Sequence, residues 1–429
     1  MKLLADLSPL RSSAAFRRLW AGTSLSAVGG ALTTFAVTLQ VYDITRSPVA
    51  VGLIGLAIMV PLLTVGLLGG PLIDAVDKRI LIGVCTCAAM AVSAALTVQA
   101  FLGLRMVWLL YLLVAVESAI GAVNAPARRA LTPALLSAGD LAAGLALQRL
   151  TFQITLIAGP ALAGLIAAAP HLGLAGCYLI DTVSFCAALY GTARLPPMKA
   201  EGSSPERSRL AAVADGISFI ARTPVLAGAF IADLNATFFG LPTSLFPAIN
   251  AARFGGDPRT LGLFTTAIGV GGLVSAVLSG PLTRVSRQGL AMLASASVWG
   301  GGFAVFAVTR SLWLTLLALA VAGAADTVTV VLRGIIVGTV TPRRFRGRVM
   351  AVDYVVGAGG GQLGSLEAGA VGSLTSPEVS ALTGGLLAVL GTVAIGAALP
   401  AFRRYRARAA DPAPAGESSG AEHLADVEP

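Results

Sequence analysis

The chain has 429 residues, of which 56% are hydrophobic and only 12% are charged, with a mean hydropathy of +0.83 and a formal net charge of +9. Soluble domains normally carry about 25% charged residues, so this composition excludes a soluble globular protein. The four cysteines and two histidines form no pattern typical of a disulfide framework or a metal site. The sequence is therefore that of a polytopic membrane protein.

Apolar stretches separated by short loops recur along the whole chain. A bilayer core about 30 Å thick is spanned by about 20 apolar residues in a helix, and unpaired backbone groups are not tolerated in hydrocarbon. We predict twelve membrane-spanning helices, over residues 17–41, 49–73, 80–101, 106–124, 141–168, 173–193, 223–250, 259–283, 290–309, 312–339, 349–372 and 379–401. No short apolar segment with a cleavage site precedes the first helix, so we expect the N-terminus to stay on the chain.

The positions of Lys and Arg predict the orientation in the membrane, because basic residues in short loops resist translocation. With both termini in the cytoplasm, most of the 30 basic residues lie on the cytoplasmic side. The arginines left on the outer side are Arg46, Arg105, Arg253, Arg259 and Arg310. The positive net charge is thus explained by topology, and we expect no nucleic-acid partner.

The longest internal loop divides the predicted helices six and six. Residues 194–222 are rich in Pro, Ser and charge, which is typical of an interdomain linker. We predict an N-terminal bundle over 1–193 and a C-terminal bundle over 223–408. The tail, 409–429, is rich in Pro, Ala and acidic residues without an apolar period, which predicts disorder.

The two halves repeat each other in sequence. Residues 52–72 (GLIGLAIMVPLLTVGLLGGPL) align with residues 262–282 (GLFTTAIGVGGLVSAVLSGPL), and both are the second span of their half. A second repeat places Pro-Ala-Arg-Arg (126–129) after the fourth span and Pro-Arg-Arg (342–344) after the tenth. Duplicated six-helix bundles are an architecture of secondary transporters.

The loop after the second span carries a family resemblance. The stretch Gly70-Pro-Leu-Ile-Asp74-Ala-Val-Asp77-Lys78-Arg79 resembles the cytoplasmic signature between helices 2 and 3 of the major facilitator superfamily. It departs from that signature at Ala75, where a basic residue is common, and at Asp77, where Gly is usual. The resemblance implies an all-α membrane protein with twelve helices in two pseudo-symmetric six-helix bundles.

Further segments resemble one branch of the superfamily, the enterobactin-exporter and macrolide-efflux branch. They include FRRLWAGTSLSAVGGALTTFAV (16–37), Asn124-Ala-Pro126-Ala-Arg128, Gly159-Pro160-Ala-Leu-Ala-Gly164 and Arg346-Gly-Arg-Val349. These motifs are specific to the branch and not to a substrate. The resemblance implies secondary transport by alternating access, without an enzymatic reaction or a cofactor.

Charged side chains at membrane depth cost at least a few kcal/mol on insertion scales, so those present usually face a cavity or a partner. We interpret Asp233, Asp326 and Glu367 as candidates for proton coupling, with Arg333 as their counterion. Desolvation favours the protonated form of a carboxylic acid, which lets such a group load and release a proton as access changes. The alternative is that each residue is a structural polar lock between helices.

The helical spacing of these residues shows which of them can pair directly. Asp326 and Arg333 share a helix face but lie about 10 Å apart, too far for a direct pair. Other candidates are polar or charged residues on predicted spans: Asn235 beside Asp233, Gln362 near Glu367, Glu117 in the fourth span, and Arg149 in the fifth. Arg149 is a candidate for binding an anionic substrate or for pairing with Glu117.

A second set lies at the predicted cytoplasmic ends of the helices. The resemblance places Asp74 against the N-terminus of the eleventh helix, whose partial positive charge favours an anion. This contact is expected to form a gate that opens and closes during transport. The gate residues are expected to be Gly70, Asp74, Lys78, Arg79, Arg348 and Asp353.

The sequence therefore predicts a proton-driven exporter of a siderophore, a macrolide-like drug or a secondary metabolite. Its expected partners are the small-molecule substrate, protons and the lipid of the cell membrane, and we expect a monomer. An importer or facilitator of a small nutrient is the alternative. A lipid-modifying membrane enzyme is a remote alternative, because we find no nucleophile, acid-base pair or metal cluster that would serve it; no nucleotide-binding loop with Gly-Lys-Ser/Thr is present either.

Overall fold

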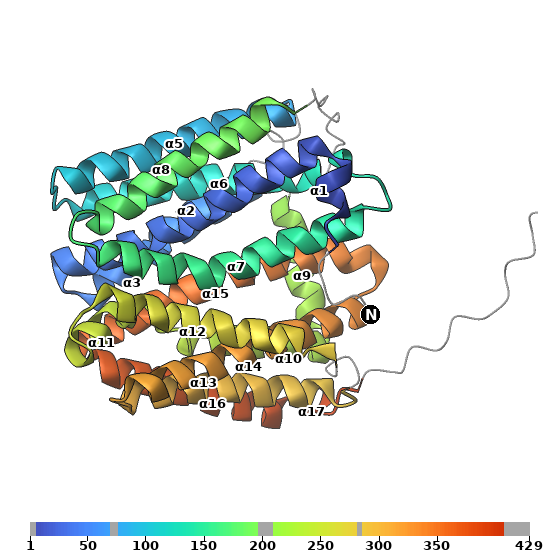
Figure 1. Cartoon of the computed structure of the whole chain (residues 1–429). Coiled ribbons are helices and arrows are strands. Elements are labelled where there is room, and N and C mark those ends of the chain that lie inside the picture. Colours follow the sequence, from blue (N-terminus) through green and yellow to red (C-terminus); the bar gives the residue numbers. More distant parts are fainter. Residues whose placement is uncertain (1–5, 69–75, 196–208, 281–284, 407–429) are drawn as a thin grey trace, which may run out of the picture.

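The computed structural model describes residues 6–68, 76–195, 209–280 and 285–406, and these residues form helices and loops without strands. The long helices run side by side in two groups (Figure 1). We call the end of the molecule that carries α1, α9 and α17 the terminal end, and the opposite end, which carries the α2–α3 connection and α11, the loop end.

The helices of the first half occupy the upper part of Figure 1. They are α1 (Ser8–Ser12), α2 (Ala14–Thr45), α3 (Pro48–Leu68), α5 (Lys78–Phe101), α6 (Val107–Leu135), α7 (Leu141–Ala167) and α8 (Gly173–Ala193). Those of the second half lie below them: α10 (Pro224–Phe239), α11 (Phe246–Arg253), α12 (Pro258–Val277), α13 (Gln288–Val308), α14 (Leu312–Val340), α15 (Arg346–Leu374), α16 (Pro377–Ala398) and α17 (Pro400–Arg403). Two short 3-10 helices, η1 (Thr243–Leu245) and η3 (Arg343–Phe345), precede α11 and α15.

Eleven segments of the described chain are long and apolar enough to cross a membrane. The twelfth spanning helix is α15, which has 29 residues but carries several glycines and charged side chains that lower its hydropathy. It runs between the two halves in Figure 1, so it does not need the apolar surface of a lipid-exposed helix. The predicted twelve-helix fold in two six-helix groups is confirmed.

Two predicted spans have different bounds in the structure. The seventh is not one helix over 223–250, because α10 ends at Phe239 and the chain resumes as η1 and α11. Pro242 explains the break, since it has no backbone N–H and disfavours helical geometry at the residue before it. The fourth span does not end at 124, because α6 continues through Pro126 and Pro133 to Leu135.

The predicted linker contains a helix of its own, α9 (Arg209–Ala221), which runs across the long helices rather than along them (Figure 1). The Phe219 ring stacks on Phe345, with centroids 4.4 Å apart and planes 9° from parallel. A Cβ atom at Gly216 would lie 2.6 Å from the backbone oxygen of Arg348, so glycine is required for this close approach. The linker is thereby attached to the start of α15 in the second half.

Among the described residues, the two halves contact each other mainly through two helix pairs, α3 with α15 and α7 with α12. A Cβ atom at Gly52 would lie 2.8 Å from the Cα of Leu366, and one at Gly164 would lie 2.6 Å from the Pro258 carbonyl. The Val49 backbone N–H also donates to Ser373 Oγ at 3.1 Å. Small residues thus let the backbones of the two halves approach closely toward the loop end.

The hydrophobic core also differs between the two ends of the molecule. One continuous cluster joins both halves, with Phe35 and Tyr42 of α2 on one side and Phe246 and Phe264 on the other. At the terminal end the buried residues form two separate clusters, one around Ile82 and Leu131 in the first half and one around Leu226, Ile336 and Phe402 in the second. The structure is therefore closed at the loop end, while the halves do not share a core at the terminal end.

Candidate transport pathway and buried charges

A buried ion network joins three helices of the second half. Arg333 on α14 donates through Nη1 to Asp233 Oδ2 on α10 at 2.6 Å. The same nitrogen lies 3.3 Å from Asp353 Oδ1 on α15. The exposed fractions of the Asp233, Arg333 and Asp353 side chains are 7%, 11% and 28%. One guanidinium therefore links two carboxylates, and the three groups carry an excess negative charge when both acids are ionised.

Asp326 belongs to the same region. It lies on α14 two helical turns before Arg333, as the spacing predicts, and it is within electrostatic range of Asp233 and Arg333. Among the described residues it makes neither a hydrogen bond nor an ion pair. Three carboxyl groups thus lie within electrostatic range of a single cation, and two of them pair with it directly. We call Asp233, Asp326, Arg333 and Asp353 the acidic cluster.

The remaining deep candidates do not join this cluster. Asn235 donates to the Ala388 carbonyl at 2.8 Å and so ties α10 to α16. Glu367 is half-buried on α15 and makes no hydrogen bond or ion pair in the described part of the chain. Glu117 on α6 is likewise without such a bond, and it lies within electrostatic range of Asp181.

The expected pair between Arg149 and Glu117 does not form. Arg149 is exposed, and its guanidinium lies 5.4 Å from the ring centroid of Phe152 on the same helix. The reason is the helical phase, since Arg149 lies two residues, or about 200°, from the buried Leu147. Arg149 therefore points away from the interior of its bundle.

The predicted gate is only partly visible. Gly70 and Asp74 lie outside the described residues. Asp77 caps the N-terminus of α5 by accepting a hydrogen bond from the Arg79 backbone N–H at 2.8 Å, so the aspartate at the usual glycine position has a structural role. The Arg79 guanidinium donates to the Ala193 carbonyl at 2.6 Å, and Lys78 is the first residue of α5.

Arg348 and Asp353 do not share a cluster, contrary to our expectation. Arg348 Nη1 lies 3.4 Å from Asp215 Oδ2 on α9, whereas Asp353 faces Arg333. The two residues are five positions apart on α15, which separates them by about 140° around the helix axis. Arg348 is therefore part of the linker contact, and Asp353 is part of the acidic cluster.

A cavity of about 880 Å³ opens between the halves at the terminal end, and we call it the terminal cavity. It is bordered by α3 and α6 of the first half, by α9, and by η3 and α15 of the second half. Its apolar lining includes Leu62, Pro126 and Tyr354, and its charged lining consists of Arg129, Arg344 and Arg348. No acidic residue is found among the described residues of its wall.

A smaller cavity of about 390 Å³, the central cavity, lies deeper between the halves. It is lined by residues of α2, α3, α7, η1, α11, α12 and α15. Its polar lining is uncharged: Thr34, Thr38, Thr155, Thr243, Ser244, Thr265, Gln362 and Ser365. The Thr155 hydroxyl is buried without a hydrogen-bond partner among the described residues.

Sequence reasoning missed a polar network inside the first half. The buried carboxylate of Asp181 accepts hydrogen bonds from Thr33 at 2.7 Å and Ser93 at 2.9 Å. The amides of Gln40 and Gln99 bond to each other in both directions at 3.0 Å. The sequence does show these polar residues within apolar spans. Their hydrogen-bond partners lie on different helices, and the sequence does not show which helices are neighbours.

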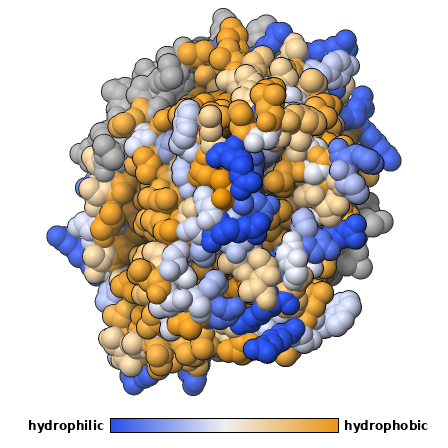
Figure 2. All heavy atoms as spheres, turned by 90° about the vertical axis from the view of Figure 1, so that its left-hand side faces the viewer, coloured by the Kyte–Doolittle hydropathy of each residue, from blue (hydrophilic) through white to orange (hydrophobic). Residues whose placement is uncertain are grey.

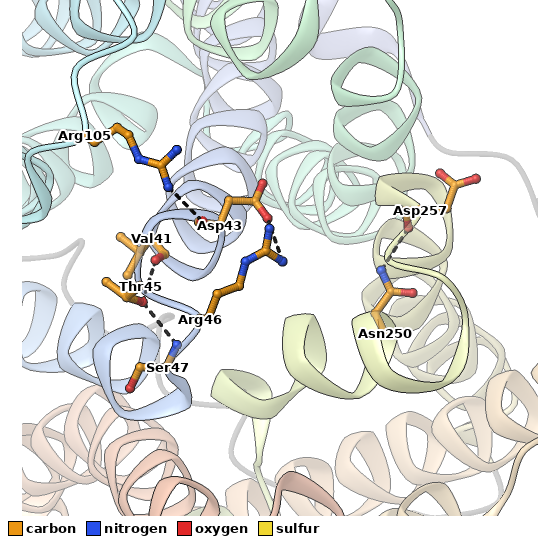
Figure 3. A network of polar contacts seen from close by, with 8 residues as sticks. All are labelled: Val41, Asp43, Thr45, Arg46, Ser47, Arg105, Asn250 and Asp257. Atoms are coloured by element: carbon orange, nitrogen blue, oxygen red, sulfur yellow. Dashed lines mark hydrogen bonds and ion pairs between the residues drawn. The ribbon is translucent and has the colours of Figure 1, made fainter.

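Polar contacts also gather at the loop end. Figure 3 shows Arg46 beside Asp43, with 3.7 Å between the charged groups, and Arg105 directed at the backbone oxygen of Asp43. Asn250 donates to the Asp257 carbonyl at 2.9 Å. Figure 2 views this end and shows hydrophilic residues near the middle of the face, flanked by hydrophobic ones.

Comparison with known proteins agrees with this architecture. The chain is 27% identical over 410 residues to the enterobactin exporter EntS of Citrobacter koseri, which covers 94% of this chain and 96% of the relative. It is 27% identical over 411 residues to EntS of Shigella boydii, with the same coverage.

Solved transporters share the fold at low sequence identity. The nucleoside transporter NupG superposes with a TM-score of 0.70 at 14% identity, covering 89% of this chain and 98% of NupG. A bacterial homologue of the iron transporter ferroportin in the inward-facing state gives a TM-score of 0.65 at 17% identity, with the same coverage. These likenesses show the fold alone.

The family model for transmembrane secretion effectors, MFS_3, matches residues 4–419. This match covers nearly the whole chain, and it agrees with the two six-helix halves and with the cavities between them. The protein is a multi-pass membrane transporter and belongs to the transmembrane secretion effector family of the major facilitator superfamily.

Proposed function

We propose that this transporter exports a small molecule in exchange for protons by alternating access, as a monomer with both termini in the cytoplasm. Relatives that match along nearly the whole chain are named enterobactin exporters, which supports the direction of transport. The distribution of basic residues supports the orientation, because it places the terminal end in the cytoplasm. The terminal cavity then opens inward, which is where an exporter collects its cargo.

The observation that carries proton coupling is the excess of carboxylates over cations in the acidic cluster. Arg333 compensates one of the buried acids, so ionisation of Asp233, Asp326 and Asp353 together leaves uncompensated charge at membrane depth. Protonation removes that charge, because it converts a carboxylate into a neutral acid. We therefore assign the proton-binding site to this cluster.

The route from the proton to the cargo passes through α15. This helix carries Asp353 in the acidic cluster, Gly347 and Tyr354 in the wall of the terminal cavity, and Gln362 and Ser365 in the wall of the central cavity. Farther along it packs against α3 at the contact that closes the loop end. A change in the bond between Arg333 and Asp353 would thus act on the helix that holds the loop end closed.

The cargo site is assigned to the central cavity, with the terminal cavity as its entrance. The uncharged hydroxyl and amide lining, with the unpaired Thr155 hydroxyl, offers hydrogen bonds to a polar but neutral part of a substrate. The name of the relatives favours a siderophore, and a macrolide-like drug or another secondary metabolite remains the alternative cargo.

The test uses the purified protein in liposomes that contain a pH-sensitive dye, with enterobactin and erythromycin as probes. An exporter of the proposed kind moves one of these probes several-fold faster under an imposed pH gradient, and addition of the probe drives protons in the opposite direction. Flux independent of the gradient would identify a facilitator, and movement of probe and protons in the same direction would identify an importer. Either result contradicts the proposal.

A further inference from the structure

We infer that the terminal cavity holds a binding site for the anionic group of an amphipathic organic substrate, formed by Arg129 of the first half and by Arg344 and Arg348 of the second. This inference rests on the proposed function, because it assigns the site to the cargo. It adds a chemical class, organic acids with an apolar body, that the export function alone does not specify.

The first argument is the origin of the arginines. Arg129 lies near the end of α6, and Arg344 lies in η3 directly before α15, so opposite halves of the molecule supply them. They occupy matching places in the internal repeat, after Pro126 and Pro342. A ligand that contacts both connects the two halves on the side where they do not share a core.

The second argument is the absence of competing anions in the described part of the chain. Arg129 makes no hydrogen bond or ion pair there, and Arg344 contacts only the ring of Phe345, with its Cζ 5.1 Å from the ring centroid. Arg348 lies at the same distance from that ring and 3.4 Å from the Asp215 carboxylate. Two of the three guanidinium groups are therefore left for a ligand.

The third argument is that the groups are held in place. Phe345 is stacked on Phe219 of α9, so its ring has a fixed position beside both arginines. A guanidinium over an aromatic face keeps its N–H groups available for a carboxylate or phosphate. The cavity is of a size typical of small-molecule sites, and Leu62, Leu67 and Pro126 offer apolar surface to the rest of the ligand.

The orientation in the membrane explains why arginines are in excess on this side. It does not explain why three of them lie in the wall of the terminal cavity. Arg403 provides the comparison: it is exposed on α17 at the same end, and it does not line the terminal cavity. Arg403→Gln is therefore a matched control for Arg129→Gln and Arg344→Gln, since each removes one positive charge.

The experiment measures equilibrium binding of 2-naphthoate and of its neutral analogue 2-naphthamide to the full chain in phosphatidylcholine nanodiscs, without a pH gradient. The wild type is expected to bind the acid about tenfold more tightly than the amide, which is the difference expected for charge-assisted hydrogen bonds. Arg129→Gln and Arg344→Gln are each expected to remove most of that preference and to leave amide binding unchanged. Arg129→Lys is expected to keep part of it, and Arg403→Gln all of it.

Several outcomes would overturn the inference. Equal binding of the acid and the amide would show that no anion site exists, and an equal effect of Arg403→Gln would show a general surface-charge effect. Displacement of 2-naphthoate by phosphatidylglycerol in the nanodisc would assign the arginines to a lipid headgroup instead of a substrate. Because binding is measured without a gradient, a failure here leaves proton-driven export intact, and a failure of proton-driven export leaves this site intact.

Discussion

The Asp233 carboxylate and the Arg333 guanidinium lie 2.6 Å apart on different helices, and both side chains are about nine-tenths buried. Removal of one partner of such a pair leaves the other charge uncompensated, at a typical cost of about 3–5 kcal/mol. We expect Arg333→Gln to lower the thermal unfolding temperature in detergent markedly, because three carboxyl groups then lose their shared cation. The double variant Asp233→Asn with Arg333→Gln is expected to recover part of the loss.

Arg310→Gln is the control for this comparison, since Arg310 is an exposed residue at the loop end. Its unfolding temperature is expected to match that of the wild type. If the single and double variants unfold at the same temperature, the two charges are not coupled energetically.

The Asp181 network predicts a variant that is less stable but still transports. Asp181→Ala removes the acceptor for both Thr33 and Ser93 inside the first half. Leaving buried hydroxyl groups unpaired costs about 1–3 kcal/mol. Thr33→Val, which removes one of these bonds, is expected to cost less. Transport per folded molecule should stay near wild type in both, since neither residue lines the two cavities; a complete loss of transport in well-folded Asp181→Ala would assign Asp181 to the pathway.

The contact between α3 and α15 predicts a reversible lock at the loop end. The Val49 N–H donates to Ser373 Oγ at 3.1 Å, so the two residues are in contact in the conformation described, and we expect cysteines at these positions to cross-link. In a background with the four native cysteines replaced, Val49→Cys with Ser373→Cys is expected to lose transport on oxidation and to regain it on reduction.

The control for the lock is each single cysteine variant under the same oxidation. The two single-cysteine variants are expected to transport at wild-type rates with and without oxidant. Full transport by the oxidised double variant, with cross-linking verified by mass spectrometry, would show that the loop end does not open during the cycle.

Hydropathy was sufficient to predict most of the spanning helices, because membrane helices are recognised by length and by apolar composition. Their division into two six-helix bundles came from the internal repeat and from the family resemblance. Even α15, with Arg346, Asp353 and Glu367, was recognised because its charges are spaced along an otherwise apolar and small-residue stretch. The effect of proline was harder to predict. Pro126 remains inside a helix, whereas Pro242 follows Gly240, which packs against Trp299, and there the helix breaks.

The acidic cluster was predictable in its members but not in its connections. The 1.5 Å rise of a helix correctly separates Asp326 from Arg333. The helical rise does not show which other helix supplies the partner of Arg333. We therefore expected Asp353 to lie near Arg348 instead. The arginines of the terminal cavity were seen in the sequence as a repeat after two prolines, and only the packing of the halves brings them to one wall.

Proton coupling through the acidic cluster is tested most directly by Asp233→Asn and Asp326→Asn in proteoliposomes, with whichever of enterobactin and erythromycin the wild type transports. Gradient-driven efflux and gradient-free exchange of labelled cargo are measured on the same preparation, with Asp257→Asn at the exposed start of α12 as the control. The account predicts that the first two variants lose most gradient-driven efflux, by about 100-fold or more as for loss of a positioned acid-base group, while they retain exchange. Unchanged pH-driven efflux in both variants would contradict it.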